Sequence, residues 1–275
     1  MNKQPITAVI IALNEAEMIG ACIDTVAWCS DILVIDNGSV DETVKIAEQK
    51  GARVISVKHH SFSKIRNEAL KQVKTEWLLY IDADERITPT LSKEILLGIE
   101  TNAADAFSFN RTNVLFGKPM QYGNWQNDSV TRVFRKSALQ EWKGDVHEGP
   151  QVLGSTVSLK TPLIHLTHRS VESGLMKTAV WTGIEARLLA KSISTPVSPL
   201  TVLRKAVAEF IRRAVLKQGY KDGEVGLIEA AIQAINKALI YIQVWEQQNK
   251  KTIEHSYQKF ENELQQSWKD YYDNK

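Results

Sequence analysis

The chain has 275 residues, of which 43% are hydrophobic and 24% are charged, and its formal net charge is only +2. This size suits one large domain with an appendage, and the balanced charge gives no overall basic field that would favour nucleic acid. The chain contains two cysteines, Cys22 and Cys29, without a CxxC pair or a disulfide framework, which indicates a reducing compartment. We expect both cysteines in the first helix, as small apolar residues.

No signal peptide precedes the first apolar run. No stretch approaches the roughly 20 uncharged apolar residues that a membrane-spanning helix requires. The sequence therefore predicts a cytoplasmic protein, and association with a membrane surface stays open.

Short apolar runs and helical patterns alternate over the first hundred residues. We expect strands at residues 6–12, 31–36, 53–57 and 77–81, and helices at 15–28, 40–50, 63–73 and 90–100. Continuous runs such as ITAVIIA are typical of strands buried on both faces. The alternation predicts an α/β fold, with a Rossmann-like, mostly parallel sheet and flanking helices.

The pattern changes after residue 100. Short strand-like segments at 106–111, 129–135 and 157–159 indicate a smaller mixed region, and the chain reads as helical from about residue 170. A breaker-rich linker at 192–199 precedes two long helical patterns, at 200–218 and 224–248. The polar tail from 250 is either a solvated helix or partly disordered. We predict a domain at 1–190 and a C-terminal helical extension at 191–275.

Polar loops follow three of the predicted strands. Ligands of open α/β sheets bind at the carboxyl ends of the strands, so these loops should converge on one crevice. They read Asn14-Glu15, Asp36-Asn37-Gly38-Ser39 and Asp82-Ala83-Asp84-Glu85.

Asp82 and Asp84 carry the sharpest signal. Side chains at i and i+2 of an extended chain point the same way, so two carboxylates leaving a buried strand make a site for Mg²⁺ or Mn²⁺. Such an ion would neutralise a departing diphosphate. An isolated Asp-x-Asp is more often a solvated acidic turn, but the preceding run WLLYI and the other two loops favour the metal site.

Asp36 ends a buried strand, where a carboxylate should pair with something or bind it. It can accept a hydrogen bond from a uracil ring N–H. Gly38 permits a tight turn there, and Ser39 can bond locally. The alternative is an ordinary Asx turn before a helix.

These motifs together resemble the family 2 glycosyltransferases of the GT-A fold. Asn14-Glu15, DNGSVDET, KIRNEA at residues 64–69 and YIDADE occur in the family's order and spacing over the first hundred residues. The resemblance implies an inverting transferase in which Asp36 contacts the nucleotide base and Arg66 lies near the nucleotide or its phosphates. Asp82 would face the ribose or the metal, and Asp84 would bind the metal. The remaining expected donor contacts are Asn14, Glu15, Gly38 and Ser39.

Inversion by direct displacement needs a general base that takes the proton of the acceptor hydroxyl. Many members of the family carry an acidic pair for this purpose downstream of the DxD motif. This chain instead has Gly144-Asp145-Val146-His147-Glu148-Gly149. We predict Glu148 as the base, with His147 as an orienting group or phosphate contact and Asp145 as the rival base. The alternative is a plain surface loop.

The second half of the chain resembles the lipopolysaccharide core glucosyltransferases. The motifs are VHE at 146–148, HLTHRS at 165–170 and GYKDG at 219–223. The resemblance implies transfer of glucose from UDP-glucose to an inner-core heptose of a lipid-linked acceptor, with another surface polysaccharide or glycolipid as the alternative. Residues 1–100 would bind the nucleotide sugar, and 101–190 would form the acceptor side. His165 and His168 are either contacts of the diphosphate or metal, or structural hydrogen-bonding residues.

Residues 200–221 form a basic amphipathic pattern that suits an anionic membrane surface, so we expect a peripheral protein on the inner face of the cytoplasmic membrane. The alternative is a helix that packs on the catalytic domain or on a second subunit, and a homo-oligomer is possible. The basic residues are Arg204, Lys205, Arg212, Arg213, Lys217 and Lys221, against one acid, Glu209.

Two other classes of protein have to be weighed. A sugar nucleotidyltransferase usually needs a Gly-rich, basic phosphate loop after its first strand, where this chain has Ala12-Leu13-Asn14-Glu15-Ala16. A non-catalytic membrane-surface binding module would have no need of Asp82, Asp84 and Glu148. The sequence therefore favours the transferase over both.

Overall fold

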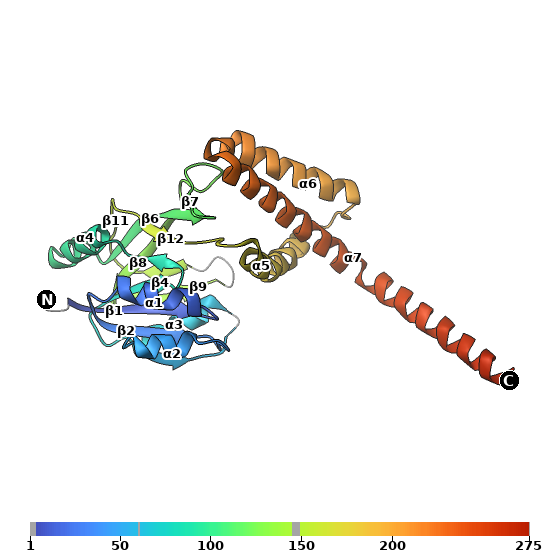
Figure 1. Cartoon of the computed structure of the whole chain (residues 1–275), viewed down its shortest axis with the longest axis horizontal. Coiled ribbons are helices and arrows are strands. Elements are labelled where there is room, and N and C mark those ends of the chain that lie inside the picture. The colour runs from blue at the N-terminus through green and yellow to red at the C-terminus, as the bar shows by residue number, and fades with distance from the viewer. Residues whose placement is uncertain (1–3, 60, 145–148, 275) are drawn as a thin grey trace. The chain divides into compact units, whose positions relative to one another are not determined.

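The computed structural model describes residues 4–59, 61–144 and 149–274. The chain divides into two compact units, Met1–Ser170 and Val171–Lys275, and each is described by itself (Figure 1). The first helix of the second unit therefore falls inside the predicted domain 1–190. The compact units divide before this helix, because it packs its apolar side on the long C-terminal helix.

The first unit alternates strands and helices. The elements of its N-terminal part are β1 (Gln4–Ala12), α1 (Ala16–Thr25), β2 (Cys29–Asp36), α2 (Thr43–Gln49), β3 (Arg53–Ser56), α3 (Phe62–Gln72), β4 (Trp77–Asp82), β5 (Glu85–Arg86) and α4 (Pro89–Glu100). The remainder consists of β6 (Ala106–Leu115), β7 (Lys118–Pro119), β8 (Ser129–Arg135), β9 (Leu139–Lys143), β10 (Gly149–Val152), β11 (Thr156–Ser158) and β12 (Leu163–His165).

These strands form one 10-stranded sheet and a separate hairpin of β9 and β10. The main path of the sheet runs β3-β2-β1-β4-β8-β6-β12-β5, and β7 and β11 both pair with β6. The first four strands are parallel, and β8 joins β4 antiparallel. Such a mostly parallel sheet with flanking helices is the GT-A architecture that the sequence predicts.

The sheet has a hydrophobic core on each face, because alternate residues of β1 point in opposite directions. Ile10 packs with Ile19 of α1 and Leu91 of α4 in one core. Ile11 packs with Ile65 of α3 in the other. This two-sided burial explains why β1, β2 and β4 read as unbroken apolar runs.

Two residues, Ala83 and Asp84, join β4 to β5, yet three strands lie between them in the path of the sheet. The sheet must therefore curl so that its last strands return to the carboxyl end of β4. This return brings β12 beside the DxD motif.

The second unit is helical. It contains α5 (Val171–Ser192), α6 (Pro199–Ile211), the π-helical turn η1 (Arg212–Leu216), the 3₁₀ turn η2 (Gly219–Asp222) and α7 (Gly223–Asp273). Ala186 of α5 packs with Ile240 and Val244 of α7 in a small core of its own. The tail from residue 250 is helical, which decides between the two alternatives that its sequence left open.

The region Gly219–Asp273 is long and apolar enough to cross a membrane by length and composition, with an 18-residue window of mean hydropathy 1.4. The expectation that no stretch would qualify is thus corrected. That expectation counted uninterrupted apolar residues, whereas charged residues such as Glu229 and Lys237 are spaced among the apolar residues of α7. A long core helix can meet the same criterion, and 28% of this window is buried.

The cysteines are both buried, but only Cys22 lies in α1. Cys29 begins β2, because α1 ends at Thr25, earlier than the sequence predicts. The expected strands and helices of the first hundred residues are otherwise present with slightly shifted ends. The expected strands at 106–111, 129–135 and 157–159 correspond to β6, β8 and β11. The short strands β5, β7, β9, β10 and β12 were not expected from the sequence.

Candidate active site

The first two polar loops are bonded to each other. The side-chain oxygen of Asn14 accepts from the backbone N–H of Val40 at 2.9 Å, and the N–H of Asn14 donates to Ser39 Oγ at 2.8 Å. The N–H of Glu15 donates to Thr43 Oγ1 at 2.8 Å. Asn14 itself takes a left-handed conformation with φ 54°, which Asn tolerates better than most residues. The structure therefore brings Asn14, Glu15 and Ser39 together at the ends of β1 and β2.

Asp36 is buried at the end of β2 and closes its own turn. Its carboxylate accepts hydrogen bonds from the N–H groups of Gly38 at 3.1 Å and Ser39 at 3.0 Å. Gly38 has φ 99°, a conformation that side chains rarely adopt. These bonds are those of an Asx turn, the alternative weighed above. A carboxylate has about four lone-pair sites, so the turn leaves capacity for a ligand.

Asp82 lies between two buried guanidinium groups. Nη2 of Arg132 is 2.6 Å from Asp82 Oδ2, and Nη2 of Arg66 is 3.3 Å from Oδ1. Burial alone would raise the pKa of Asp82, but the positive charges of Arg132 and Arg66 outweigh it and hold this pKa well below its usual range. Asp82 is therefore a carboxylate at neutral pH, with both oxygens engaged by arginines.

Glu85 is fully buried beneath Asp82 and completes the same network. Its Oε2 accepts from the backbone N–H of Asp82 at 2.8 Å, and its Oε1 accepts from Nη2 of Arg132 at 3.1 Å. Arg111 reaches the same Oε1 at 3.4 Å. Burial raises the pKa of Glu85, and the charge of Arg132 offsets part of that increase. Glu85 therefore fixes the backbone of the DxD turn from within the protein.

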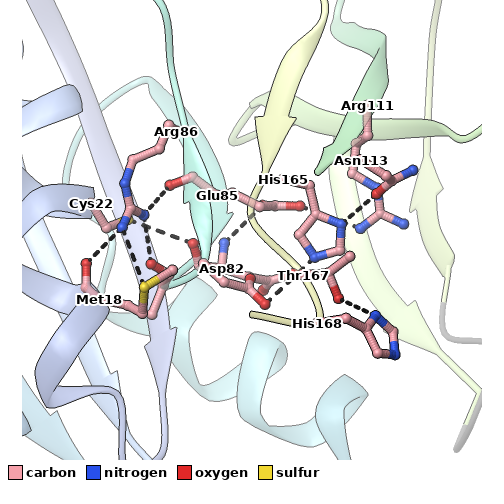
Figure 2. A network of polar contacts seen from close by, with 12 residues as sticks. Met18, Cys22, Asp82, Glu85, Arg86, Arg111, Asn113, His165, Thr167 and His168 are labelled. Carbon is pink, nitrogen blue, oxygen red and sulfur yellow. Dashed lines mark hydrogen bonds and ion pairs between the residues drawn. The ribbon is translucent and has the colours of Figure 1, made fainter. Parts of the chain in front are cut away.

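The other side of the turn is fixed by Arg86 (Figure 2). Its Nη1 donates to the carbonyl oxygens of Ala83 at 2.7 Å and Glu85 at 2.6 Å, and its Nη2 donates to the carbonyl of Met18 at 3.0 Å. Cys22 lies under the turn, where burial raises the pKa of its thiol far above the ordinary range. The thiol is therefore protonated and structural, as the sequence predicts.

His165 reaches Asp84 because of strand pairing. In the antiparallel pair of β12 and β5, His165 is opposite Glu85, and the N–H of Leu166 donates to the carbonyl of Asp84 at 2.8 Å. This pairing sets Nε2 of His165 3.5 Å from Oδ2 of Asp84. Figure 2 shows His165 on the far side of the turn from Arg86. His168 faces Thr167 and Trp125 instead, with Nδ1 at 3.1 Å from Thr167 Oγ1.

The tautomer of His165 follows from its second contact. The amide nitrogen of buried Asn113 donates to the carboxylate of Asp128 at 2.9 Å, which leaves its Oδ1 to face Nδ1 of His165 at 2.6 Å. An amide oxygen only accepts, so Nδ1 carries the proton. When the ring is neutral, Nε2 carries no proton, and its lone pair points toward Asp84. A hydrogen bond to the other ring nitrogen sets the orientation of histidines that bind metals.

Asp84 and His165 fit a divalent cation, because a carboxylate oxygen and an imidazole nitrogen are ligands that Mn²⁺ accepts. Within residues 4–59, 61–144 and 149–274, no group of three or more His, Cys, Asp and Glu side chains is arranged to hold a metal. Mg²⁺-type ions are commonly held by one or two protein carboxylates together with substrate phosphates. The donor set therefore suits an ion that binds with a diphosphate. Asp82 is the poorer ligand, since its oxygens face two guanidinium groups.

Arg66 is buried on α3, with its guanidinium carbon 4.7 Å from the ring centroid of Trp142 and 5.8 Å from that of Tyr80. The hydroxyl of Tyr80 donates to the backbone carbonyl of Arg66 at 2.7 Å. The resemblance places Arg66 near the nucleotide or its phosphates. In the structure its positive charge lies against Asp82 and the face of Trp142.

The predicted base residues Asp145, His147 and Glu148 lie outside the described residues. The hairpin that flanks them is described: Gly149 of β10 pairs with Lys143 of β9. The side chain of Asn67 holds the backbone of Trp142 through both of its amide atoms, at 2.8 and 3.0 Å. Asn67 directly follows Arg66, so the end of β9 is fixed beside the arginine that pairs with Asp82.

Sequence reasoning missed the buried support of this site. Glu85 was given no role although it follows the DxD pair directly, and Arg132 is a charged residue next to the buried Val133 and Phe134 of β8. Arg111, Asn113 and Asp128 form the shell around His165, with Arg111 bonded to Asp128 at 2.8 and 2.9 Å. An arginine beside apolar residues in a predicted strand was the available signal for Arg132.

An α/β sheet with an acidic turn at the carboxyl end of β4 is the arrangement predicted above for a glycosyltransferase, and the comparison with protein families agrees. Residues 7–172 match the model of glycosyl transferase family 2, and the chain belongs to this family. It is 23% identical over 254 residues to the lipopolysaccharide core biosynthesis glycosyltransferase LpsC of Rhizobium meliloti, covering 89% of this chain and 93% of LpsC. An uncharacterised glycosyltransferase of Rickettsia felis is 24% identical over 251 residues, covering 86% of this chain and 88% of that protein. The predicted resemblance to lipopolysaccharide core enzymes is confirmed.

Solved structures with a related arrangement include TarS of S. aureus, residues 1–349, in complex with UDP-GlcNAc. The two structures superpose with a TM-score of 0.48 and 15% sequence identity. The match covers 93% of this chain and 92% of the TarS chain. A second structure is glucosyl-3-phosphoglycerate synthase of Mycobacterium tuberculosis in complex with Mg²⁺ and UDP, with a TM-score of 0.44 and 17% sequence identity. The match covers 67% of this chain and 78% of the synthase chain.

Proposed function

We propose that this glycosyltransferase moves a sugar, with glucose from UDP-glucose as the first candidate, to a lipid-linked acceptor such as an inner-core heptose of lipopolysaccharide. The observation that carries the proposal is the meeting of Asp84 and His165 beside Asp82, at the carboxyl edge of a family 2 domain. The match to LpsC along most of both chains supports the acceptor class. A different surface polysaccharide or glycolipid is the alternative acceptor.

Asp84 and His165 would hold Mg²⁺ or Mn²⁺, which supplies positive charge against the diphosphate leaving group. Asn113 keeps the lone pair of His165 Nε2 directed toward Asp84. Asp82 would face the ribose of the donor, held in place by Arg132 and Arg66. At the ends of β1 and β2, Asp36 would contact the base, and Asn14, Glu15, Gly38 and Ser39 would shape the floor of the donor site.

Glu148 would take the proton of the acceptor hydroxyl as it attacks the anomeric carbon, with His147 as its orienting group. Asp145 is the rival for the same role. The anchoring of Trp142 by Asn67 supports this proposal, because it holds β9, which precedes these residues in the sequence, beside Arg66.

The proposal is tested by incubating the protein with UDP-glucose and Mn²⁺, with and without a lipid-linked heptose acceptor. Release of UDP that depends on acceptor supports transfer. A nucleotidyltransferase would instead consume sugar phosphate and UTP, and a binding module would do neither. In the same assay Glu148→Gln should bind donor and lose transfer, and a wild-type rate for this variant would move the assignment to Asp145, tested as Asp145→Asn.

The orientation of His165 gives a prediction that needs no acceptor. Asn113→Leu removes the oxygen that faces Nδ1, so the ring can turn or take the other tautomer. We expect the affinity for Mn²⁺ in the presence of UDP to fall about 10–100-fold, the usual cost of losing a hydrogen-bond partner of a metal-binding histidine. Calorimetric titration with Mn²⁺ measures this change. Asn110→Leu, at an exposed position of the same strand, is the matched control, and an equal loss of affinity in both variants would contradict the role of Asn113.

We also propose that residues 200–221 bring the enzyme to the anionic inner face of the cytoplasmic membrane. Every residue of α6 is at least partly exposed, and its apolar residues include Leu200 at 73% and Leu203 at 61% exposure. Not all of the predicted basic residues are equally available. Arg212 and Arg213 both bond Glu209, at 2.6 and 2.7 Å, and lower its pKa to about 2.

Removing the exposed charges should therefore release the protein from vesicles. The test variant carries Arg204→Gln, Lys217→Gln and Lys221→Gln, and each basic residue near an anionic surface contributes about 1 kcal/mol. We expect binding to vesicles that contain anionic lipid to weaken by about a hundredfold in a sedimentation assay, and more at low salt than at high salt. Lys45→Gln, Lys93→Gln and Lys160→Gln, at exposed positions of the first unit, form the control variant. Equal binding by both variants would favour a packing role for α6.

A further inference from the structure

The last part of α7 carries a solvent-exposed apolar stripe. The stripe consists of Tyr257, Phe260, Leu264 and Trp268, which are between 53% and 70% exposed. Their spacings of three and four residues place all four on one side of the helix. The packing of α7 in its own unit involves earlier residues such as Tyr241 and Val244.

A helix of this kind is not expected to stand alone in water. Most of the stability of a helix comes from packing its apolar face, and isolated helices are marginal. The stripe extends over about 17 Å at the helical rise of about 1.5 Å per residue. Three of its four residues are aromatic, and an aromatic side chain buries about 150–250 Å² when it is covered. The stripe thus approaches the roughly 800 Å² per partner of a stable protein interface.

The charges around the stripe match a second copy in the opposite direction. Residues 250–259 carry three lysines against one glutamate, and residues 260–273 carry four acids against one lysine. In an antiparallel pair the basic end of each helix meets the acidic end of the other. In a parallel pair, ends of like charge would meet.

The same charges disfavour a membrane as the occupant. Residues 254–273 contain five acidic residues against two lysines. The cytoplasmic leaflet is anionic and attracts basic segments, so it repels this one. This segment differs in that respect from residues 200–221.

We infer that residues 253–273 of α7 form an antiparallel helix pair with the same segment of a second copy of this chain, and that the protein is a dimer through it. The stripe residues form the seam. Phe260 of each copy lies near Leu264 of the other, because the seam is centred between them. The inference is independent of the transferase chemistry.

The test is sedimentation velocity on the full-length protein across a concentration series. We expect a monomer–dimer equilibrium with a dissociation constant on the order of 10⁻⁶ M. Phe260→Glu with Leu264→Glu places like charges in the seam and should weaken the dimer at least about a hundredfold. His255→Glu with Asn262→Glu adds two glutamates to the opposite side of the helix and should leave the dimer intact. Circular dichroism checks that both variants stay helical.

The orientation has its own test. Lys250→Glu with Lys251→Glu should weaken an antiparallel dimer, and adding Asp270→Lys with Asp273→Lys to the same chain should restore it. A wild-type protein that stays monomeric, or a dimer unaffected by the seam variant, overturns the inference. Failure of the charge-reversal pair overturns the antiparallel arrangement. A seam variant that loses vesicle binding without a change of mass would identify the stripe as a lipid contact and overturn the inference as well.

Discussion

Asp84→Ala is expected to lower kcat/KM for sugar transfer about a thousandfold while the protein stays folded. The change removes the carboxylate beside His165 and with it one of the two protein donors of the proposed Mg²⁺ or Mn²⁺ site. Stabilisation of a leaving diphosphate by a metal amounts to several kcal/mol, and about 4 kcal/mol corresponds to the expected factor. Transfer kinetics measure the loss, and binding of Mn²⁺ in the presence of UDP, followed by electron paramagnetic resonance, measures its cause.

Asp24→Ala is the matched control for this experiment. Asp24 lies on α1 with its side chain 59% exposed and paired to Lys50, so its loss should leave metal binding and transfer near wild type. A rate for Asp84→Ala within about tenfold of wild type would remove Asp84 from the mechanism. Full activity of the wild-type enzyme in the presence of a chelator would do the same for the metal.

The parts of the site that lie close together in the sequence could be predicted from it. The buried strand 77–81 and the two aspartates after it are contiguous in the sequence. An apolar run followed by polar residues therefore predicted both the strand and its exposed end. The convergence of the first three loops followed from the general behaviour of parallel sheets. The bonds from Asn14 to Val40 and Ser39 agree with that expectation.

The approach of His165 to Asp84 could not be predicted in this way. It depends on the pairing of β12 with β5, two strands of three and two residues that are too short to give a periodic pattern. The pairing is non-local and arises only when the sheet curls. For this reason the sequence left two alternative roles open for His165. In the structure, the contact with Asn113 distinguishes His165 from His168.

The sequence left open whether the helix continues past residue 250, for a different reason. The sequence after Gln248 is polar, and polarity suggested a boundary. Gln, Lys and Glu are good helix formers, and no proline or glycine interrupts residues 227–273, so the helix continues to Asp273. The apolar stripe became visible only once the helix was continuous, because its residues are spread through a polar segment.

Arg132→Met should destabilise the first unit by about 3–5 kcal/mol at neutral pH. Arg132 is the common partner of Asp82 and Glu85, at 2.6 and 3.1 Å. Without it, these carboxylates keep only the longer contacts with Arg66 and Arg111, at 3.3 and 3.4 Å, so their charges are poorly compensated in the protein interior. For a unit of this size the midpoint of thermal unfolding should fall by roughly 6–20 °C. Arg132→Lys keeps a positive charge in reach of both carboxylates and should lose much less.

The loss of stability in Arg132→Met should depend on pH. Arg132 holds the folded-state pKa of Asp82 below its unfolded value of about 3.9, so the stabilisation by the pair is complete above that pH and is lost as the pH falls below it. In Arg132→Met, Glu85 takes up a proton first, since burial already raises its pKa and the offsetting charge is gone. The difference in stability between wild type and variant should therefore be largest near pH 7 and shrink toward pH 3.

A double-mutant cycle isolates the network. Glu85→Gln in the Arg132→Met background removes one of the two carboxylates that lost Arg132, so the double variant should be less destabilised than the sum of the single variants. Asp82 would still keep its contact with Arg66 in that background. A loss below about 1 kcal/mol for Arg132→Met, or an equal loss at pH 7 and pH 3, would mean that the buried charges are compensated from elsewhere. In that case Arg86 and the strand pairing of β5, rather than the buried ion pairs, would determine the geometry of the DxD turn.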